Sequence, residues 1–208
     1  MKNMKRSIIL IILILSVVLS ITTPVLASSN ELVIQFEDFK YTTNDYDEKN
    51  IRIEYDSDDF IETANIIDVN SNEILETVSV ERLGYRGFTS PYIFKRVNYY
   101  GVTGVQLSAY VEIYNNGSFR QINSVNGSNL SITTPHSMAY LENTNSSAWS
   151  NKFPTTEIKY AYDGNLTVDT NVSGGLSGGY PGFEFVGQIG GTYRYRRTIS
   201  STGTFSVY

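Results

Sequence analysis

Residues 175–179, Gly-Leu-Ser-Gly-Gly, match the Gly-x-Ser-x-Gly pattern that surrounds the nucleophilic serine of many hydrolases. That pattern acts only where a strand precedes the serine, a helix follows it and a histidine lies further along the chain. Here Tyr180, Pro181 and Gly182 follow, and the single histidine, His136, precedes the serine. We therefore interpret the segment as a flexible connection between strands and expect no serine-hydrolase chemistry.

Other catalytic and metal-binding patterns are also incomplete. Paired carboxylates can hydrolyse glycosidic bonds, but the acidic residues between positions 45 and 59 lie in stretches typical of solvated turns. Residues 68–72, Asp-Val-Asn-Ser-Asn, begin like a calcium loop, yet Glu73 replaces the required glycine and Ser79 the bidentate glutamate. A looser cation site at 56–59 is the less favoured interpretation of that acidic cluster. The sequence predicts a non-enzymatic protein without a cofactor or a metal.

A basic run near the C-terminus is the main candidate for binding. It reads Tyr193-Arg194-Tyr195-Arg196-Arg197. In a strand the two tyrosines share one face, and Arg194 and Arg196 share the other. This patch could contact lipid headgroups or wall polymers. The favoured interpretation is structural: the guanidinium groups pair with the acidic first half and dock it onto the second.

Trp149 is the only tryptophan and the second candidate for binding. It lies within residues 143–152, which are rich in Asn and Ser and predict a long surface loop. We expect the indole to plug the core beneath that loop rather than to serve as a platform for a ligand.

The elements that position these residues are predicted to be strands. Residues 105–114 alternate strictly, with apolar side chains at the odd positions, as in a strand buried on one face. Three-residue loops at 115–117, 163–165 and 201–203 would each join two antiparallel strands with matching faces. The first of these loops would place Ile113 opposite Phe119. The expected fold is an all-β, antiparallel β-sandwich built from hairpins.

The chain divides by charge. Residues 28–89 carry fifteen acidic and five basic residues, whereas residues 90–208 carry six and eight. Strands predicted at 51–55, 60–68 and 73–80 make residues 28–90 a smaller acidic β-meander, and residues 91–208 form the sandwich domain. A boundary near residue 90 is compatible with two packed units and also with one continuous sandwich. Nucleic acid is an unfavourable partner for so acidic a chain.

The N-terminus has the layout of a signal peptide. Three cations precede an apolar run at residues 8–19, and residues 25–27, Val-Leu-Ala, suit a signal peptidase. We expect cleavage between Ala27 and Ser28, which removes residues 1–27 and takes the net charge from −5 to −8. An uncleaved anchor is the alternative, but polar residues interrupt the run too early for a span. The chain contains no cysteine, so a secreted product depends on its core for stability.

Three segments carry a resemblance to known proteins: Tyr-Tyr-Gly-Val-Thr-Gly at 99–104, Gly-Ser-Phe-Arg-Gln-Ile at 117–122, and residues 193–200. They resemble features of small secreted proteins of Bacillus-like and Clostridium-like bacteria, including the large heat-labile bacteriocins of the geobacillin type. The resemblance covers roughly the second half of the chain and implies an antibacterial protein.

These observations predict a secreted, extracellular and non-enzymatic protein that is bacteriocin-like or binds the cell envelope. Its expected partners are a bacterial envelope, a wall polymer or a membrane surface. An adhesive or matrix protein is the alternative, since Tyr, Ser, Asn and Gly are abundant. A secreted hydrolase is the least favoured alternative.

Overall fold

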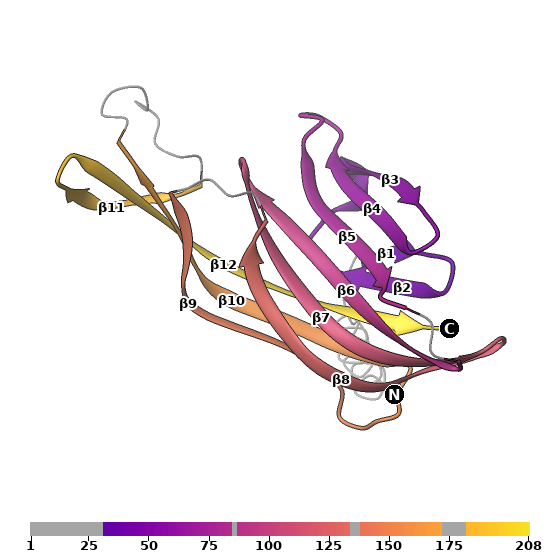
Figure 1. Cartoon of the computed structure of the whole chain (residues 1–208). Coiled ribbons are helices and arrows are strands. Elements are labelled where there is room, and N and C mark those ends of the chain that lie inside the picture. The colour runs from indigo at the N-terminus through magenta and orange to yellow at the C-terminus, as the bar shows by residue number, and fades with distance from the viewer. Residues whose placement is uncertain (1–30, 85–86, 134–137, 172–181) are drawn as a thin grey trace, which may run out of the picture.

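The computed structural model describes residues 31–84, 87–133, 138–171 and 182–208. Within these ranges the chain forms two antiparallel sheets that pack into a sandwich (Figure 1). The predicted all-β sandwich is therefore confirmed. The signal peptide with Ala27 and Ser28, the segment 175–179 and His136 lie outside the described residues.

Each sheet has six strands within the described part of the chain. Sheet A has the order β1 (Leu32–Gln35), β2 (Phe39–Thr43), β12 (Thr192–Val207), β10 (Glu157–Thr170) and β9 (Ala139–Trp149), and β11 (Glu184–Ile189) pairs with one end of β12. Sheet B follows chain order: β3 (Ile51–Ser57), β4 (Ile61–Asp68), β5 (Ile74–Arg82), β6 (Thr89–Tyr100), β7 (Thr103–Asn116) and β8 (Phe119–Ile132). A short 3-10 helix, η1 (Glu48–Asn50), precedes β3. None of the described segments is a helix that could span a bilayer.

The core lies between the sheets, and the alternation of side chains along β7 illustrates how it is built. Its odd-numbered residues from Val105 to Ile113 are all buried, while Tyr110 on the other face is exposed. Alternation of side chains along an extended strand gives this result directly. The predicted inward face of residues 105–114 is confirmed.

The β7–β8 hairpin exists, but its predicted register is wrong. Asn116 pairs with Phe119 around a two-residue loop in which Gly117 has a positive φ of 63°. Ile113 therefore faces the buried Ile122, and Phe119 is exposed. Two register shifts further along the β7–β8 pair accommodate the extra residues of β8.

The other two predicted hairpins are wrong for a different reason. Residues 163–165 and 201–203 lie inside β10 and β12, which pair with each other along their whole length. Their glycines permit close approach rather than a turn. A Cβ on Gly203 would overlap the Tyr160 hydroxyl and lie 2.8 Å from the Thr42 carbonyl oxygen. Likewise, the predicted loop at 143–152 is mostly strand, because its polar residues belong to β9, at the edge of sheet A.

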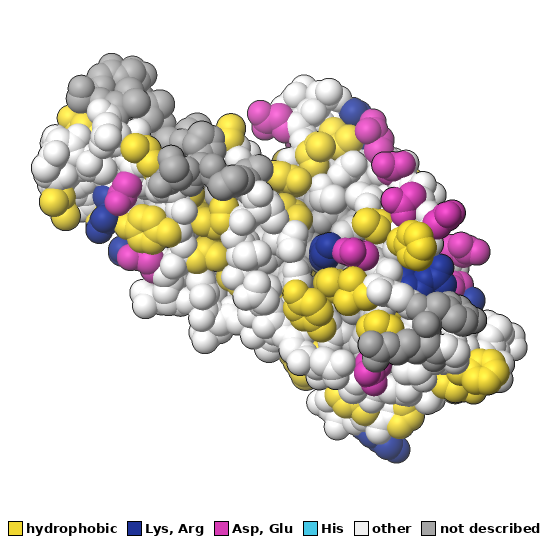
Figure 2. Space-filling model, in the orientation of Figure 1, with side chains coloured by type: hydrophobic (Ala, Val, Ile, Leu, Met, Phe, Trp, Pro, Cys, Tyr) yellow, Lys and Arg dark blue, Asp and Glu magenta, His cyan; other side chains and the backbone are white. Residues whose placement is uncertain are grey.

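The first half of the chain is built into the same two sheets as the second. Strands β3, β4 and β5 form the predicted meander, and Figure 2 shows acidic side chains gathered over it. The turn before β5 is closed by Asp68, which accepts hydrogen bonds from the backbone N–H groups of Asn70 and Ser71 at 2.8 Å. Across the boundary predicted near residue 90, β5 pairs with β6 from Glu76 to Arg82. Sheet B is therefore continuous there, as in the single-sandwich alternative.

Candidate functional site

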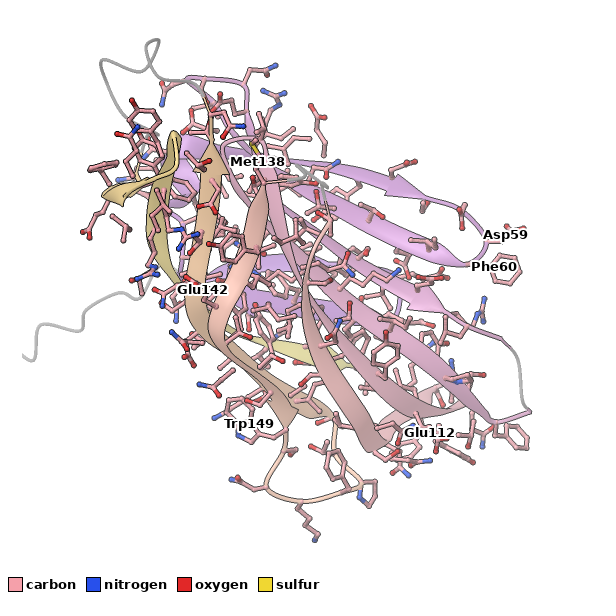
Figure 3. The ribbon with its side chains drawn as sticks, turned by 60° about the vertical axis from the view of Figure 1, so that its left-hand side comes forward. Asp59, Phe60, Glu112, Met138, Glu142 and Trp149 are labelled. Atoms are coloured by element: carbon pink, nitrogen blue, oxygen red, sulfur yellow. The ribbon has the colours of Figure 1, made fainter. Side chains whose placement is uncertain are left out.

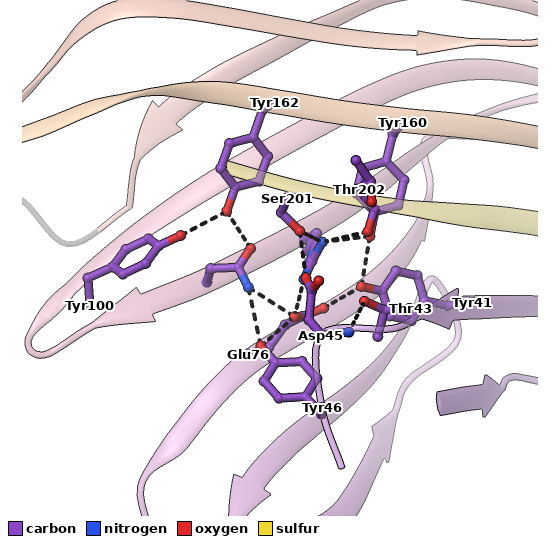
Figure 4. Close-up of polar contacts among 12 residues, drawn as sticks. Tyr41, Thr43, Asp45, Tyr46, Glu76, Tyr100, Tyr160, Tyr162, Ser201 and Thr202 are labelled. Atoms are coloured by element: carbon purple, nitrogen blue, oxygen red, sulfur yellow. Dashed lines mark hydrogen bonds and ion pairs between the residues drawn. The ribbon is translucent and has the colours of Figure 1, made fainter. Parts of the chain in front are cut away.

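A cluster of polar side chains is buried between the two sheets, where a sandwich normally holds apolar residues (Figure 4). Neither Arg96 of β6 nor Glu76 of β5 exposes any of its side chain to solvent. We call this set the buried polar cluster; its members are Tyr41, Asp45, Tyr46, Glu76, Arg96, Asn98, Tyr100, Tyr160, Tyr162 and Ser201. Asp45 lies at its edge, with a side chain that is 38% exposed.

Arg96 is the centre of the cluster. Its Nη2 atom lies 2.6 Å from an oxygen of Glu76 and 2.6 Å from an oxygen of Asp45. Its Nη1 atom donates to the hydroxyls of Tyr160, at 2.8 Å, and Ser201. The guanidinium therefore joins both sheets and the segment after β2, since Ser201 and Tyr160 belong to sheet A.

A ring of hydrogen bonds closes around the same ion pair. The Tyr160 hydroxyl donates to that of Tyr41 at 2.7 Å, and Tyr41 donates to Glu76 at 2.6 Å. Glu76 also accepts hydrogen bonds from Tyr46 and Asn98, at 2.8 and 2.9 Å. A buried carboxylate is tolerated only with such full pairing, because its desolvation is costly.

The electrostatics of the cluster keep its phenols protonated. Burial raises the pKa of Tyr41 well above its usual value, and the neighbouring Glu76 carboxylate raises it further. Burial likewise raises the pKa values of Tyr160 and Tyr162. Burial opposes the charge on Arg96, but Glu76 raises its pKa above the usual value. The tyrosines thus act as neutral hydrogen-bond donors, and the cluster joins the sheets rather than presenting groups to a substrate.

Sequence reasoning missed this cluster, although a signal was present. Arg96 is in phase with the buried residues Tyr92 and Phe94 along β6, and Glu76 is in phase with Val78 along β5. A charged residue at a position where alternation demands a core residue marks a buried ion pair.

The basic run predicted to bind a partner lies in β12, but its arginines are already paired. Arg194 makes two hydrogen bonds to Asp169, at 2.8 and 2.9 Å, and Arg196 lies 2.9 Å from Glu142. Hydrogen bonds from Arg194 lower the pKa of Asp169 below its usual value. Both acids belong to the second half, so the interpretation that this run docks the acidic first half is wrong. Arg197 lies over the Tyr100 ring, 4.7 Å from its centroid.

Arg96 and Arg120 pair with acids of the first half instead. Arg96 contacts Glu76 and Asp45, as described above, and Arg120 lies 2.5 Å from Asp38. Charge balance alone cannot identify these pairs, because it does not say which arginines face inward.

Strand β11 pairs with the adjoining end of β12 at one end of sheet A, where β12 also pairs with β10 (Figure 1). We call β11 and this end of β12 the ribbon. The side chains of Phe185, Val186 and Ile189 are exposed there by 58, 48 and 72%. The Phe185 ring lies 6.4 Å from Tyr193 and 5.7 Å from Tyr195, so these rings form one aromatic face. Figure 2 shows exposed hydrophobic side chains at the same end. Sequence reasoning identified the tyrosines but not the apolar residues of β11.

Trp149 ends β9 and is 39% exposed, so it is not a plug in the core (Figure 3). It borders a hollow of about 290 Å³ and a second one of about 220 Å³. The expectation of a buried indole failed because the segment around it is an edge strand rather than a loop covering the core.

The described residues contain no group of three or more His, Asp or Glu side chains that could hold a metal ion. The chain matches no protein-family model, and no curated protein or solved structure is significantly similar to it. The site and the fold define an antiparallel β-sandwich whose sheets are joined by hydrogen bonds around a buried ion pair and which exposes an apolar ribbon.

Proposed function

We propose that this protein is secreted and acts outside the cell by binding a bacterial envelope, without catalysing a reaction. In this proposal the ribbon of β11 and β12 is the surface that contacts lipid. The exposed apolar side chains of Phe185, Val186 and Ile189 are the observation that carries the proposal.

The physical argument is the cost of exposing these side chains to water. Fully burying one Val, Ile or Phe side chain contributes about 1.5–3 kcal/mol of favourable free energy. Among the described strands β11 pairs only with β12, so it is an edge strand whose apolar side chains are exposed, and a lipid surface would bury them. The nearby Tyr193 and Tyr195 suit the boundary between lipid and water, since a tyrosine has an apolar ring and a polar hydroxyl.

The pairing of charged residues indicates that the contact between the ribbon and lipid is apolar rather than electrostatic. Arg194 and Arg196 are held by Asp169 and Glu142, and the whole chain has a net charge of −5. Attraction to anionic headgroups is therefore weak, and binding should extend to neutral lipid and change little with salt.

Co-sedimentation with phosphatidylcholine vesicles tests the proposal. The ribbon variant carries Phe185→Ser, Val186→Ser and Ile189→Ser, and it should bind at least about tenfold less than the wild type. A matched control carries Ile74→Ser, Phe88→Ser and Val102→Ser, which remove the same three residue types from exposed positions of sheet B and its turns. Equal binding by the two variants, or no binding by the wild type, would contradict the proposal.

A further inference from the structure

The outer face of sheet A carries a row of side chains that ends at Trp149. Trp149 of β9 pairs with Lys159 of β10, Lys159 pairs with Thr204 of β12, and Thr204 pairs with Thr42 of β2. The neighbouring Tyr160 points into the core, so alternation places Lys159 and its register partners on the outside.

Two hollows meet at this row. The hollow of about 290 Å³ is lined by polar side chains from three strands, β2, β10 and β12, together with Trp149 of β9 and Tyr160. The hollow of about 220 Å³ lies on the loop after β9, where Asn151 and Glu157 line it. Trp149 and Lys159 line both, so the exposed indole borders two hollows.

Lys159 and Thr204, which lie on the outer face beside the indole, are available to bind a ligand, whereas Thr42 is only 6% exposed. Within the part of the chain that the structure describes, the side chains of Thr42, Lys159 and Thr204 make no hydrogen bond to protein. In the same part, Lys159 and Glu157 form no ion pair. Arg194 and Arg196 of the same sheet are, by contrast, paired with acids.

We propose that this row is a binding site for an oligosaccharide. A flat indole can stack on the apolar C–H face of a sugar ring, while hydroxyl, amide and amino groups around it bind the sugar hydroxyls. The lining of the larger hollow combines Trp149 with threonine, asparagine and lysine side chains, so apolar ring surface and polar groups lie together there. The two hollows that share Trp149 favour a ligand of at least two linked rings.

The chain offers a sensitive readout of this site. Trp149 is its only tryptophan, so intrinsic tryptophan fluorescence reports on this position alone. The probes are chitotetraose, maltotetraose and soluble muropeptides from digested peptidoglycan, titrated into the purified protein. We expect a saturable change in emission with at least one of them, and calorimetry should give the same affinity.

Variants separate this site from the ribbon. Trp149→Ala should weaken glycan binding by roughly tenfold or more in calorimetry, and Trp149→Phe should weaken it less because a ring remains. Phe60→Ala removes another exposed aromatic side chain, 62% exposed, and should leave binding unchanged. The serine variant of the ribbon should still bind glycan, so failure of vesicle binding leaves this proposal standing. Absence of saturation with all three probes, or equal affinity of wild type and Trp149→Ala, would overturn it.

Discussion

The guanidinium of Arg96 and the carboxylate of Glu76 lie 2.6 Å apart between the two sheets, and neither side chain is exposed. Removing one partner of such a pair leaves an uncompensated buried charge, which costs about 3–5 kcal/mol. We predict that Arg96→Met lowers the free energy of unfolding by about that amount, measured by urea denaturation.

The neighbouring residue provides the control for this prediction. Lys95 points away from the core and pairs with Glu81, with side chains that are 28 and 25% exposed. Lys95→Met should cost about 0–1 kcal/mol. Adding Glu76→Leu to Arg96→Met should recover part of the loss, because the orphaned charge is then gone. Similar costs for the Arg96 and Lys95 variants would show that the buried pair does not stabilise the fold.

Close packing of β12 on β10 gives a second prediction. Gly203→Ala places a methyl group against the Tyr160 hydroxyl and the Thr42 carbonyl oxygen, so it should destabilise the protein by about 1–3 kcal/mol. Gly187→Ala is the matched control, since a Cβ there meets nothing within 4 Å. Thermal unfolding of the two variants provides the measurement. An unchanged midpoint for Gly203→Ala would contradict the observed contact.

Acid should weaken the attachment of β12 to β10. Hydrogen bonds from Arg194 lower the pKa of Asp169 below its usual 3.8. A carboxyl group whose pKa is lower in the folded than in the unfolded protein stabilises the fold at pH values above the unfolded-state pKa. This stability is lost as the pH falls through the folded-state pKa. Carboxyl-carbon NMR should show Asp169 titrating below 3.8 in the wild type and higher in Arg194→Gln. An identical midpoint in both proteins would show that the pair has no effect on Asp169.

Bacteriocin-like action makes a separate prediction. A protein that damages membranes through the ribbon should release dye from liposomes and kill related bacteria, and the serine variant of Phe185, Val186 and Ile189 should lose both effects. If the wild type instead pellets with cell walls or self-assembles without releasing dye, the bacteriocin hypothesis fails and an adhesive role gains support.

The fold class was predictable because alternation along strands is a strong signal, as in residues 105–114. The connections between strands were less predictable. In the sequence, a glycine that permits close packing of two strands cannot be distinguished from a glycine in a turn. Gly203 illustrates this: it lies opposite Tyr160 in the middle of a sheet, and only the position of that partner explains it. The sequence around Gly203 contains no information about so distant a neighbour.

The candidate sites were predictable only in part. The basic run at Arg194 and Arg196 was visible, but the acids that neutralise it are 25 and 54 residues away in the chain. Predicting the exposed position of Trp149 would have required recognising β9 as an edge strand. The exposure of the apolar residues of β11 depends on the strand order, because β11 pairs with β12 alone among the described strands. The sequence does not show that order.

The absence of cysteine from the chain allows one direct measurement of the ribbon. A polarity-sensitive fluorophore attached to Ile189→Cys reports on the apolar residue with the largest exposure in the ribbon, and the same fluorophore on Val102→Cys serves as the reference. On adding phosphatidylcholine vesicles, emission from position 189 should shift to shorter wavelength and gain intensity, while emission from position 102 stays unchanged. An unchanged spectrum at position 189, or equal shifts at both positions, would contradict insertion of the ribbon into lipid.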